Sequence, residues 1–161
     1  MKEFFKTLSV SLVIVLIVYN FVGRPVRIEG NSMYPNLKDG ELALSGVFTK
    51  LTGYDRFDIV ILQNDKTENP IVKRIIGLPY EIVEYRNNKL YINNEVVEEE
   101  FLSEEVYTDN FRYELGKDEY FCLGDNRNVS RDSRFYGAFK EKDILAKDML
   151  VLLPLSEFGI K

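Results

Sequence analysis

Residues 82–92 read Ile82-Val83-Glu84-Tyr85-Arg86-Asn87-Asn88-Lys89-Leu90-Tyr91-Ile92, and this stretch decides the fold class. Two short runs rich in β-branched and aromatic residues flank the pair Asn87-Asn88. Because asparagine tolerates the left-handed backbone of a tight hairpin turn, the stretch predicts two antiparallel strands. A second pair, Asn93-Asn94, predicts that the chain turns back again into residues 95–97.

The same pattern recurs along the chain after Arg24. Short runs rich in Val, Ile, Tyr and Phe alternate with turn residues, which is typical of strands. We expect strands at residues 26–29, 41–48, 57–62, 71–76, 82–85, 89–92, 120–123 and 144–153. A chain of 161 residues fits one domain with a modest core. The sequence therefore predicts a mainly β fold, with a compact antiparallel β domain over residues 24–161.

The N-terminal region has a different composition, because residues 7–23 contain no charged side chain. This length lies at the lower end of the roughly 17–25 residues that a membrane-spanning helix needs. We interpret residues 7–23 as a transmembrane anchor. A cleaved secretory signal is the alternative, but its apolar region is usually shorter, and no small-x-small cleavage triplet follows here. Basic residues on the two sides balance, so charge leaves the orientation open.

Composition excludes several function classes. A net charge of −5 and the absence of a Lys/Arg cluster argue against a nucleic-acid partner. With no histidine and only Cys122, an intrachain disulfide and a thiolate zinc site are excluded, and most transition-metal sites are improbable. We therefore expect neither a metal nor a cofactor. The acidic residues gather in residues 95–100 and 104–105, which we interpret as a solvated connection.

The absence of histidine also restricts any serine nucleophile. Ser32 lies in Gly30-Asn31-Ser32-Met33-Tyr34-Pro35, and without an imidazole its proton must go to another base, such as a neutral lysine amine. Lys73 lies among apolar residues in Ile71-Val72-Lys73-Arg74-Ile75-Ile76, and such surroundings lower a lysine pKa. The alternatives are a strand-edge lysine whose amine reaches solvent and a loop serine that serves a turn.

A third polar stretch follows the strand expected at residues 120–123. It reads Gly124-Asp125-Asn126-Arg127-Asn128-Val129-Ser130-Arg131-Asp132-Ser133-Arg134. Carboxylates and guanidiniums of this kind can fix a loop through bidentate pairs, and a hydroxyl could orient a lysine amine. The alternative is a polar turn with weak surface ion pairs.

Together the three stretches resemble bacterial type I signal peptidases, the membrane-anchored Ser/Lys leader peptidases, in a short form like the Gram-positive ones. The family motif Ser-Met-x-Pro corresponds to residues 32–35, and Lys-Arg-x-x-Gly-x-Pro corresponds to residues 73–79. Gly-Asp-Asn-Arg-x-x-Ser-x-Asp-Ser-Arg corresponds to residues 124–134. The order and spacing agree as well, so the resemblance covers nearly the whole chain.

The resemblance implies a role for each matching residue. Ser32 would be the nucleophile, with its backbone N–H as an oxyanion donor, and Lys73 would be the general base and then the acid. Ser130 would orient Lys73. Two ion pairs, Asp125 with Arg74 and Asp132 with Arg134, would support the site. Ile28, Met33 and Val72 match positions that line pockets for the small side chains of an Ala-x-Ala site, although each could equally be core packing.

The resemblance also implies removal of signal peptides from exported preproteins at the bacterial cell membrane. Residues 1–6 would lie in the cytoplasm and residues 24–161 on the outer face, with preproteins and the lipid bilayer as partners. One alternative is a pilus-associated paralogue that binds or chaperones pilin subunits. Another is a self-cleaving repressor, which would need a DNA-binding domain where this chain has its apolar segment.

Four positions depart from the family pattern. Some members place a second oxyanion-donating serine where this chain has Gly30, so the second donor stays unassigned. Members often have Thr at the position of Asn36 and Gly-Asp at the position of Tyr80-Glu81. The last difference leaves the local turn geometry open.

Overall fold

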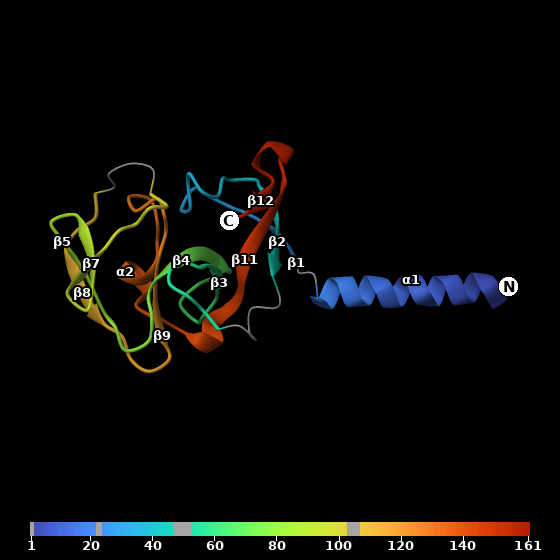
Figure 1. Cartoon of the computed structure of the whole chain (residues 1–161), viewed down its shortest axis with the longest axis horizontal. Coiled ribbons are helices and arrows are strands. Elements are labelled where there is room, and N and C mark those ends of the chain that lie inside the picture. Colours follow the sequence, from blue (N-terminus) through green and yellow to red (C-terminus); the bar gives the residue numbers. More distant parts are fainter. Residues whose placement is uncertain (1, 22–23, 47–52, 103–106) are drawn as a thin grey trace.

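The computed structural model describes residues 2–21, 24–46, 53–102 and 107–161 (Figure 1). Helix α1 (Lys2–Phe21) extends away from the sheets, and its side chains at residues 3–13 are exposed. Across the described ranges, no helix combines the length and hydropathy that a membrane crossing requires. The anchor expected at residues 7–23, whose last two residues lie outside the described ranges, stays a prediction.

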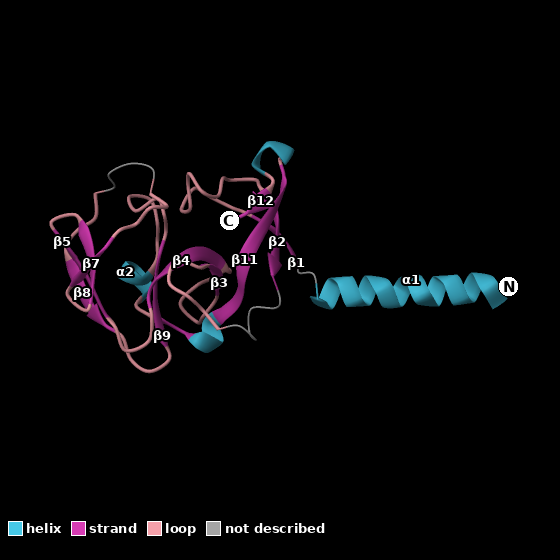
Figure 2. Cartoon of the chain, viewed as in Figure 1, coloured by secondary structure: helices cyan, strands magenta, loops and turns pink. Residues whose placement is uncertain are grey.

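The mainly β prediction is confirmed, since the described residues form two antiparallel sheets (Figure 2). The larger sheet has the order β1-β2-β11-β3-β4-β9-β10, with β12 paired to β11, and the smaller has the order β7-β6-β5-β8. The larger sheet contains β1 (Arg24–Arg27), β2 (Leu42–Gly46), β3 (Ile59–Leu62), β4 (Ile71–Gly77), β9 (Glu119–Leu123), β10 (Phe139–Lys140), β11 (Ile144–Leu153) and β12 (Gly159–Ile160). The smaller sheet contains β5 (Ile82–Arg86), β6 (Lys89–Ile92), β7 (Glu95–Val97) and β8 (Phe111–Glu114). Short helical turns are α2 (Ser133–Tyr136), η2 (Glu141–Asp143) and η3 (Leu155–Glu157).

The hairpin predicted from the two asparagine pairs is present in the smaller sheet. Strand β5 pairs with β6 and β6 pairs with β7, both antiparallel. Asn87 and Asn88 have φ values of 50° and 59°, and Asn93 and Asn94 have values of 51° and 71°. All four residues adopt the left-handed backbone that asparagine tolerates better than most residues. Local turn chemistry therefore sets the register of β5, β6 and β7.

Several strand boundaries differ from the prediction. The strand expected at residues 57–62 begins at Ile59, because Phe57 has a φ of 75° that interrupts the extended backbone. Strand β1 lies two residues earlier than expected. Strand β8 was not predicted; it pairs with β5 at the edge of the smaller sheet. The last two residues of the strand expected at 41–48 lie outside the described ranges.

Strand β4 lies in the interior of the larger sheet and is buried from Lys73 to Gly77. On one side it pairs with β3 and on the other with β9. At its end the backbone approaches β5 closely, because a Cβ added at Gly77 would lie 2.2 Å from Val83 Cγ2. This position inside the fold removes the middle of β4, including the lysine, from solvent.

Candidate active site

The fold brings Ser32 and Lys73 together from positions 41 residues apart. Lys73 Nζ donates a hydrogen bond to Ser32 Oγ at 2.8 Å. Lys73 belongs to the buried part of β4, and Ser32 lies in the connection between β1 and β2. Met33 is 1% exposed and its carbonyl accepts the N–H of fully buried Leu37, so packing fixes the turn that presents Ser32. The alternative that Lys73 lies at a strand edge with its amine in solvent is wrong, because Lys73 is only 3% exposed.

Burial changes the proton affinity of Lys73. It lowers the pKa of the amine from 10.5 to about 8, although the negative charge of Asp132 acts in the opposite direction. At pH 7 about a tenth of the molecules would carry a neutral amine, against roughly one in a few thousand for an ordinary lysine. Nζ also donates to the carbonyl of Val72 at 2.7 Å, which fixes the side chain. A hydroxyl next to an amine of this kind is an arrangement suited to nucleophilic catalysis.

The loop of residues 124–134 lies against the backbone of Ser32. The N–H of Asn126 donates to the Ser32 carbonyl at 3.0 Å. A Cβ added at Gly124 would lie 2.5 Å from that carbonyl oxygen and 2.2 Å from Ser130 Oγ. Ser130 is therefore close to the backbone of Ser32, but within the described residues its buried Oγ has no hydrogen-bond partner. The structure shows no bond from Lys73 to Ser130, so the orienting role of Ser130 stays a prediction.

One buried ion pair connects this loop to β4. Arg74 donates to Asp125 through Nε at 2.9 Å and through Nη2 at 2.7 Å. A third nitrogen of the same guanidinium donates to the carbonyl of Phe57 at 2.9 Å. Asn36, noted in the sequence only as a departure, donates to Asp125 Oδ2 at 2.9 Å. Asp125 is 1% exposed, and these hydrogen-bond donors compensate the burial of its carboxylate.

A second ion pair braces the loop from within. Arg134 donates to both oxygens of Asp132, at 2.9 Å and 2.8 Å. Asp132 also caps α2 and accepts the N–H of Gly124 at 3.1 Å. Nη2 of Arg134 also donates to the carbonyl of Arg127 at 2.7 Å and, more weakly, to that of Ser130 at 3.5 Å. These bonds fix both ends of the loop relative to each other.

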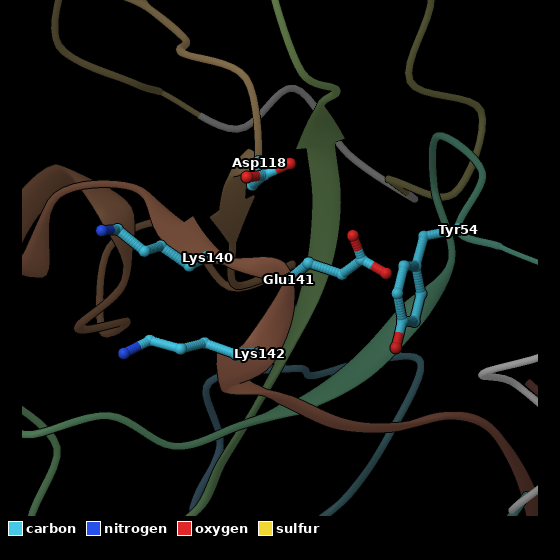
Figure 3. Close-up of a pocket in the computed structure, with 5 residues that line it drawn as sticks. All are labelled: Tyr54, Asp118, Lys140, Glu141 and Lys142. Atoms are coloured by element: carbon cyan, nitrogen blue, oxygen red, sulfur yellow. The ribbon is translucent and has the colours of Figure 1, made fainter.

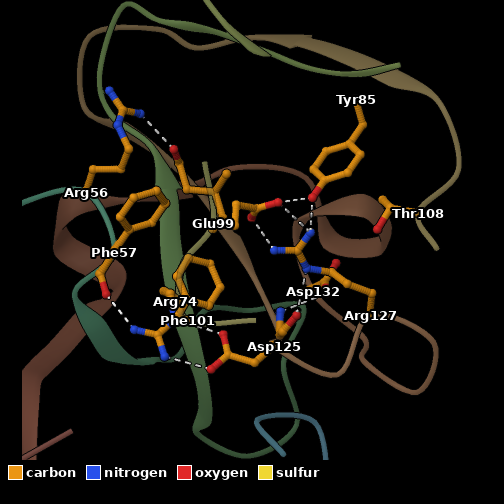
Figure 4. A network of polar contacts seen from close by, with 12 residues as sticks. Arg56, Phe57, Arg74, Tyr85, Glu99, Phe101, Thr108, Asp125, Arg127 and Asp132 are labelled. Atoms are coloured by element: carbon orange, nitrogen blue, oxygen red, sulfur yellow. Dashed lines mark hydrogen bonds and ion pairs between the residues drawn. The ribbon is translucent and has the colours of Figure 1, made fainter. Parts of the chain in front are cut away.

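A third polar group was missed by the sequence interpretation (Figure 4). Arg127 pairs with Glu99 at 2.5 Å and donates to the hydroxyl of Tyr85 at 2.5 Å. The solvated interpretation of the acidic stretch is therefore wrong for Glu99, whose side chain is 8% exposed. No local pattern distinguishes Glu99 from its acidic neighbours, because its burial depends on a partner 28 residues away.

The turn at Tyr80-Glu81 is formed without the common Gly-Asp pair. Tyr80 has a φ of 68°, a backbone conformation that glycine adopts more easily. Glu81 accepts the N–H of Leu78 at 2.7 Å and both Nη groups of Arg56 at 2.8 Å and 2.7 Å. The side chain of Glu81, which is longer than that of the common Asp, thus holds the turn through hydrogen bonds to Leu78 and Arg56.

A cleft of about 370 Å³ opens beside the Ser32–Lys73 pair. Residues 26–30 with Ser32 and Met33 contribute to its lining, as do residues 69–73. Ile28, Met33 and Val72 are all among the lining residues, and the same three also belong to or pack on one core cluster. The three residues therefore both line the cleft and pack in the core, and their role as a substrate pocket stays a prediction.

A second hollow, of about 580 Å³, contains none of the predicted site residues (Figure 3). Its lining residues are Tyr54, Asp118, Lys140, Glu141 and Lys142. In the described ranges, no group of three or more His, Cys, Asp or Glu side chains could hold a metal ion.

The family match and the similar proteins of known name all point to signal peptidases, over most of the chain. Residues 1–153 match the family described as signal peptidase, peptidase S26. Signal peptidase I P of Bacillus subtilis subsp. natto is 36% identical over 165 residues, which cover 95% of this chain and 89% of that protein. Signal peptidase IB of Staphylococcus aureus (strain COL) is 35% identical over 175 residues, covering 97% and 91%.

A solved structure agrees with these relatives. The crystal structure of a signal peptidase I from Enterococcus faecalis V583 matches with a TM-score of 0.55 and 33% sequence identity. The match covers 60% of this chain and 97% of that chain. With the family match over most of its length and relatives above 30% identity, the chain belongs to the signal peptidase family, peptidase S26.

Proposed function

We propose that this protein is a membrane-anchored serine endopeptidase that removes signal peptides from exported preproteins after Ala-x-Ala sites. The observation that carries the proposal is the 2.8 Å contact between Ser32 Oγ and the buried amine of Lys73. The family supports signal-peptide removal as the activity. The Ser32–Lys73 dyad, the Ala-x-Ala cleavage site and the membrane anchor go beyond the family match and are our proposal.

The catalytic steps follow from the two groups. In its neutral form Lys73 accepts the proton of the Ser32 hydroxyl while Oγ bonds to the scissile carbonyl carbon. The resulting ammonium then protonates the leaving amine, and the C–N bond breaks. The neutral amine of Lys73 next takes a proton from water while the water oxygen bonds to the acyl carbonyl carbon. The ammonium then returns that proton to Ser32 Oγ as the ester C–O bond breaks, which releases the product carboxyl group and restores the Ser32 hydroxyl.

The oxyanion of the tetrahedral intermediate needs donors close to Ser32. We assign one of them, the backbone N–H of Ser32. The N–H of Gly30 donates to Asp39 Oδ1 at 2.7 Å and is therefore already engaged. The second donor stays unassigned.

The cleft supports binding of an extended peptide. In the described structure β1 pairs with β2 along one edge, and residues 26–30 of the same stretch line the cleft. The other edge of β1 is the outer edge of the larger sheet, and a signal peptide can add to it as a strand through backbone hydrogen bonds. In an extended peptide alternate side chains point to the same face, so two small residues separated by one position would enter the pockets at Ile28, Met33 and Val72.

We place the protein in the bacterial cell membrane with a single span. Residues 1–6 would be cytoplasmic, 7–23 the anchor, and 24–161 the catalytic domain on the outer face. Helix α1 supports this arrangement through exposed apolar side chains, including Leu8, Leu12 and Val13 at 53–58% exposure. Such a run is unusual on a surface that contacts only water.

A cleavage assay tests the proposal. The full chain in detergent should cut a peptide with an Ala-x-Ala junction, and Ser32→Ala and Lys73→Ala should each abolish the cut. Lys89→Ala is the matched control, because Lys89 is an exposed lysine of β6. A folded parent that binds the peptide without cutting it would instead support the pilin-binding alternative.

A further inference from the structure

Glu99 differs from its acidic neighbours in its surroundings. Glu98 and Glu100 are exposed, whereas the Glu99 side chain is 8% exposed and pairs with Arg127, whose side chain is 0% exposed. Tyr85 joins the pair, since its hydroxyl donates to Glu99 Oε2. Burial raises the pKa of the Tyr85 hydroxyl, so the group keeps its proton at neutral pH. A buried charge is retained in a protein only when a partner compensates it.

Arg127 connects this contact to the turn that begins the loop of residues 124–134, which we call the catalytic loop because of its proposed role. Its Nε donates to the carbonyl of Gly124 at 3.0 Å while its two Nη groups hold Tyr85 and Glu99. The guanidinium is planar and rigid, so the direction of Nε depends on the contacts of the other two nitrogens. Losing the carboxylate would leave a buried cation that must reorient or admit water.

The turn of residues 124–127 in turn contacts the proposed nucleophile. Asn126 donates to the carbonyl of Ser32, and Gly124 has no free space on the side of Ser32 and Ser130. A shift of this turn would therefore move the peptide unit of Ser32. The route from Glu99 to Ser32 consists of hydrogen bonds and one close packing contact.

Residues 99–101 also contact the second buried ion pair, which Arg74 forms with Asp125 (Figure 4). The ring of Phe101 lies 4.2 Å from the guanidinium of Arg74, and its carbonyl accepts the amide of Asn36 at 2.9 Å. Residues 99–101 therefore touch both Arg127 and Arg74.

We propose that Glu99 is a positioning residue for catalysis: by holding Arg127 it fixes the turn of residues 124–127 against the carbonyl of Ser32. This inference rests on the proposed function of Ser32. It assigns a catalytic consequence to Glu99, a residue that lies outside all three motifs in the sequence.

The test compares Glu99→Gln with Glu98→Gln in the full chain in detergent. Both changes remove one negative charge, but only the first removes the carboxylate that is paired with Arg127. We expect Glu99→Gln to lower kcat about 10- to 100-fold with KM little changed, because misplacement of a reacting group acts on the chemical step. Glu98→Gln should keep the parental kcat. Tyr85→Phe, which leaves the ion pair, should give a smaller loss than Glu99→Gln and serves if the latter does not fold.

Hydrogen exchange provides a readout that is independent of cleavage. The amide of Asn126 should exchange faster in Glu99→Gln than in Glu98→Gln at a temperature where both are folded. Parental kcat and parental exchange in Glu99→Gln would overturn the inference. If the folded parent cuts no peptide, the proposed function fails, and the exchange comparison alone still decides whether Glu99 positions the turn.

Discussion

The N–H of Asn126 donates to the carbonyl of Ser32 at 3.0 Å, so the catalytic loop is bonded to the peptide unit of the proposed nucleophile. The side chain of Ser32 meanwhile contacts Lys73 of β4. Ser32 is thus held through its backbone by one motif and through its hydroxyl by another. The loop and the strand must keep their relative positions for the dyad to persist, which leads to the following predictions.

The rate of peptide cleavage should depend on the ionisation of Lys73. With a pKa of about 8, the amine loses its proton as pH rises, so kcat should climb through that range and then level off. The measurement is a kcat profile from pH 6 to pH 10. A profile that is flat, or that rises only near 10.5, would show that a lowered lysine pKa does not control the reaction.

Replacing Lys73 should stabilise the protein while it abolishes activity. Between pH 8 and 10.5 the unfolded chain binds the lysine proton and the folded chain does not, so stability rises with pH in that window. Below pH 8 the full cost of burying the amine is present. Lys73→Met should therefore raise the free energy of unfolding by up to about 3 kcal/mol at pH 7, and the gain should shrink towards pH 10. Urea denaturation at both pH values measures it, and a constant difference would contradict the assignment.

Removing the charge of Asp125 should destabilise the domain. Asp125→Asn leaves the buried guanidinium of Arg74 without its carboxylate, which we expect to cost about 3–5 kcal/mol. Asp65→Asn is the control, because Asp65 is exposed and the change should alter stability by less than about 0.5 kcal/mol. Equal unfolding midpoints in urea for the two variants would show that the pair does not stabilise the fold.

A single methyl group at Gly124 should disturb the site. The added Cβ would lie 2.5 Å from the Ser32 carbonyl, and this backbone atom cannot move without displacing the nucleophile. We expect Gly124→Ala to lower kcat about 100-fold. Gly116→Ala provides the comparison, because its nearest neighbour is the flexible end of Glu119 at 3.3 Å. Parental kcat in Gly124→Ala would mean that the loop can retreat from Ser32.

Glycine at position 80 should relieve backbone strain. Tyr80 has a φ of 68° and is 70% exposed, so Tyr80→Gly removes the strain while losing few contacts. We expect a gain of about 0.5–1 kcal/mol in the free energy of unfolding. Phe158→Gly, at a similarly exposed aromatic residue with a φ of −54°, should give no gain. Thermal unfolding of the two variants distinguishes these outcomes.

Much of the fold was predictable because its signals are local. The asparagine pairs at residues 87–88 and 93–94 set two turns, and the apolar runs identified most strands. Strand β8 was missed because the alternation of Phe111 and Tyr113 with charged residues extends over only four positions and its pairing with β5 is long-range. The start of β3 was misplaced because nothing in the sequence shows the positive φ of Phe57.

The sequence by itself determined the chemistry that is available: a serine, a lysine among apolar residues, and no histidine to act as base. Only the tertiary structure decided which groups meet. It placed Ser32 against Lys73 across 41 positions, turned Glu99 inward to Arg127, and left Ser130 against Gly124 without a bond to the amine. Periodicity and turn residues act over a few positions, whereas these contacts depend on how β4, the connecting segment and the catalytic loop pack together, which no short stretch of the chain encodes.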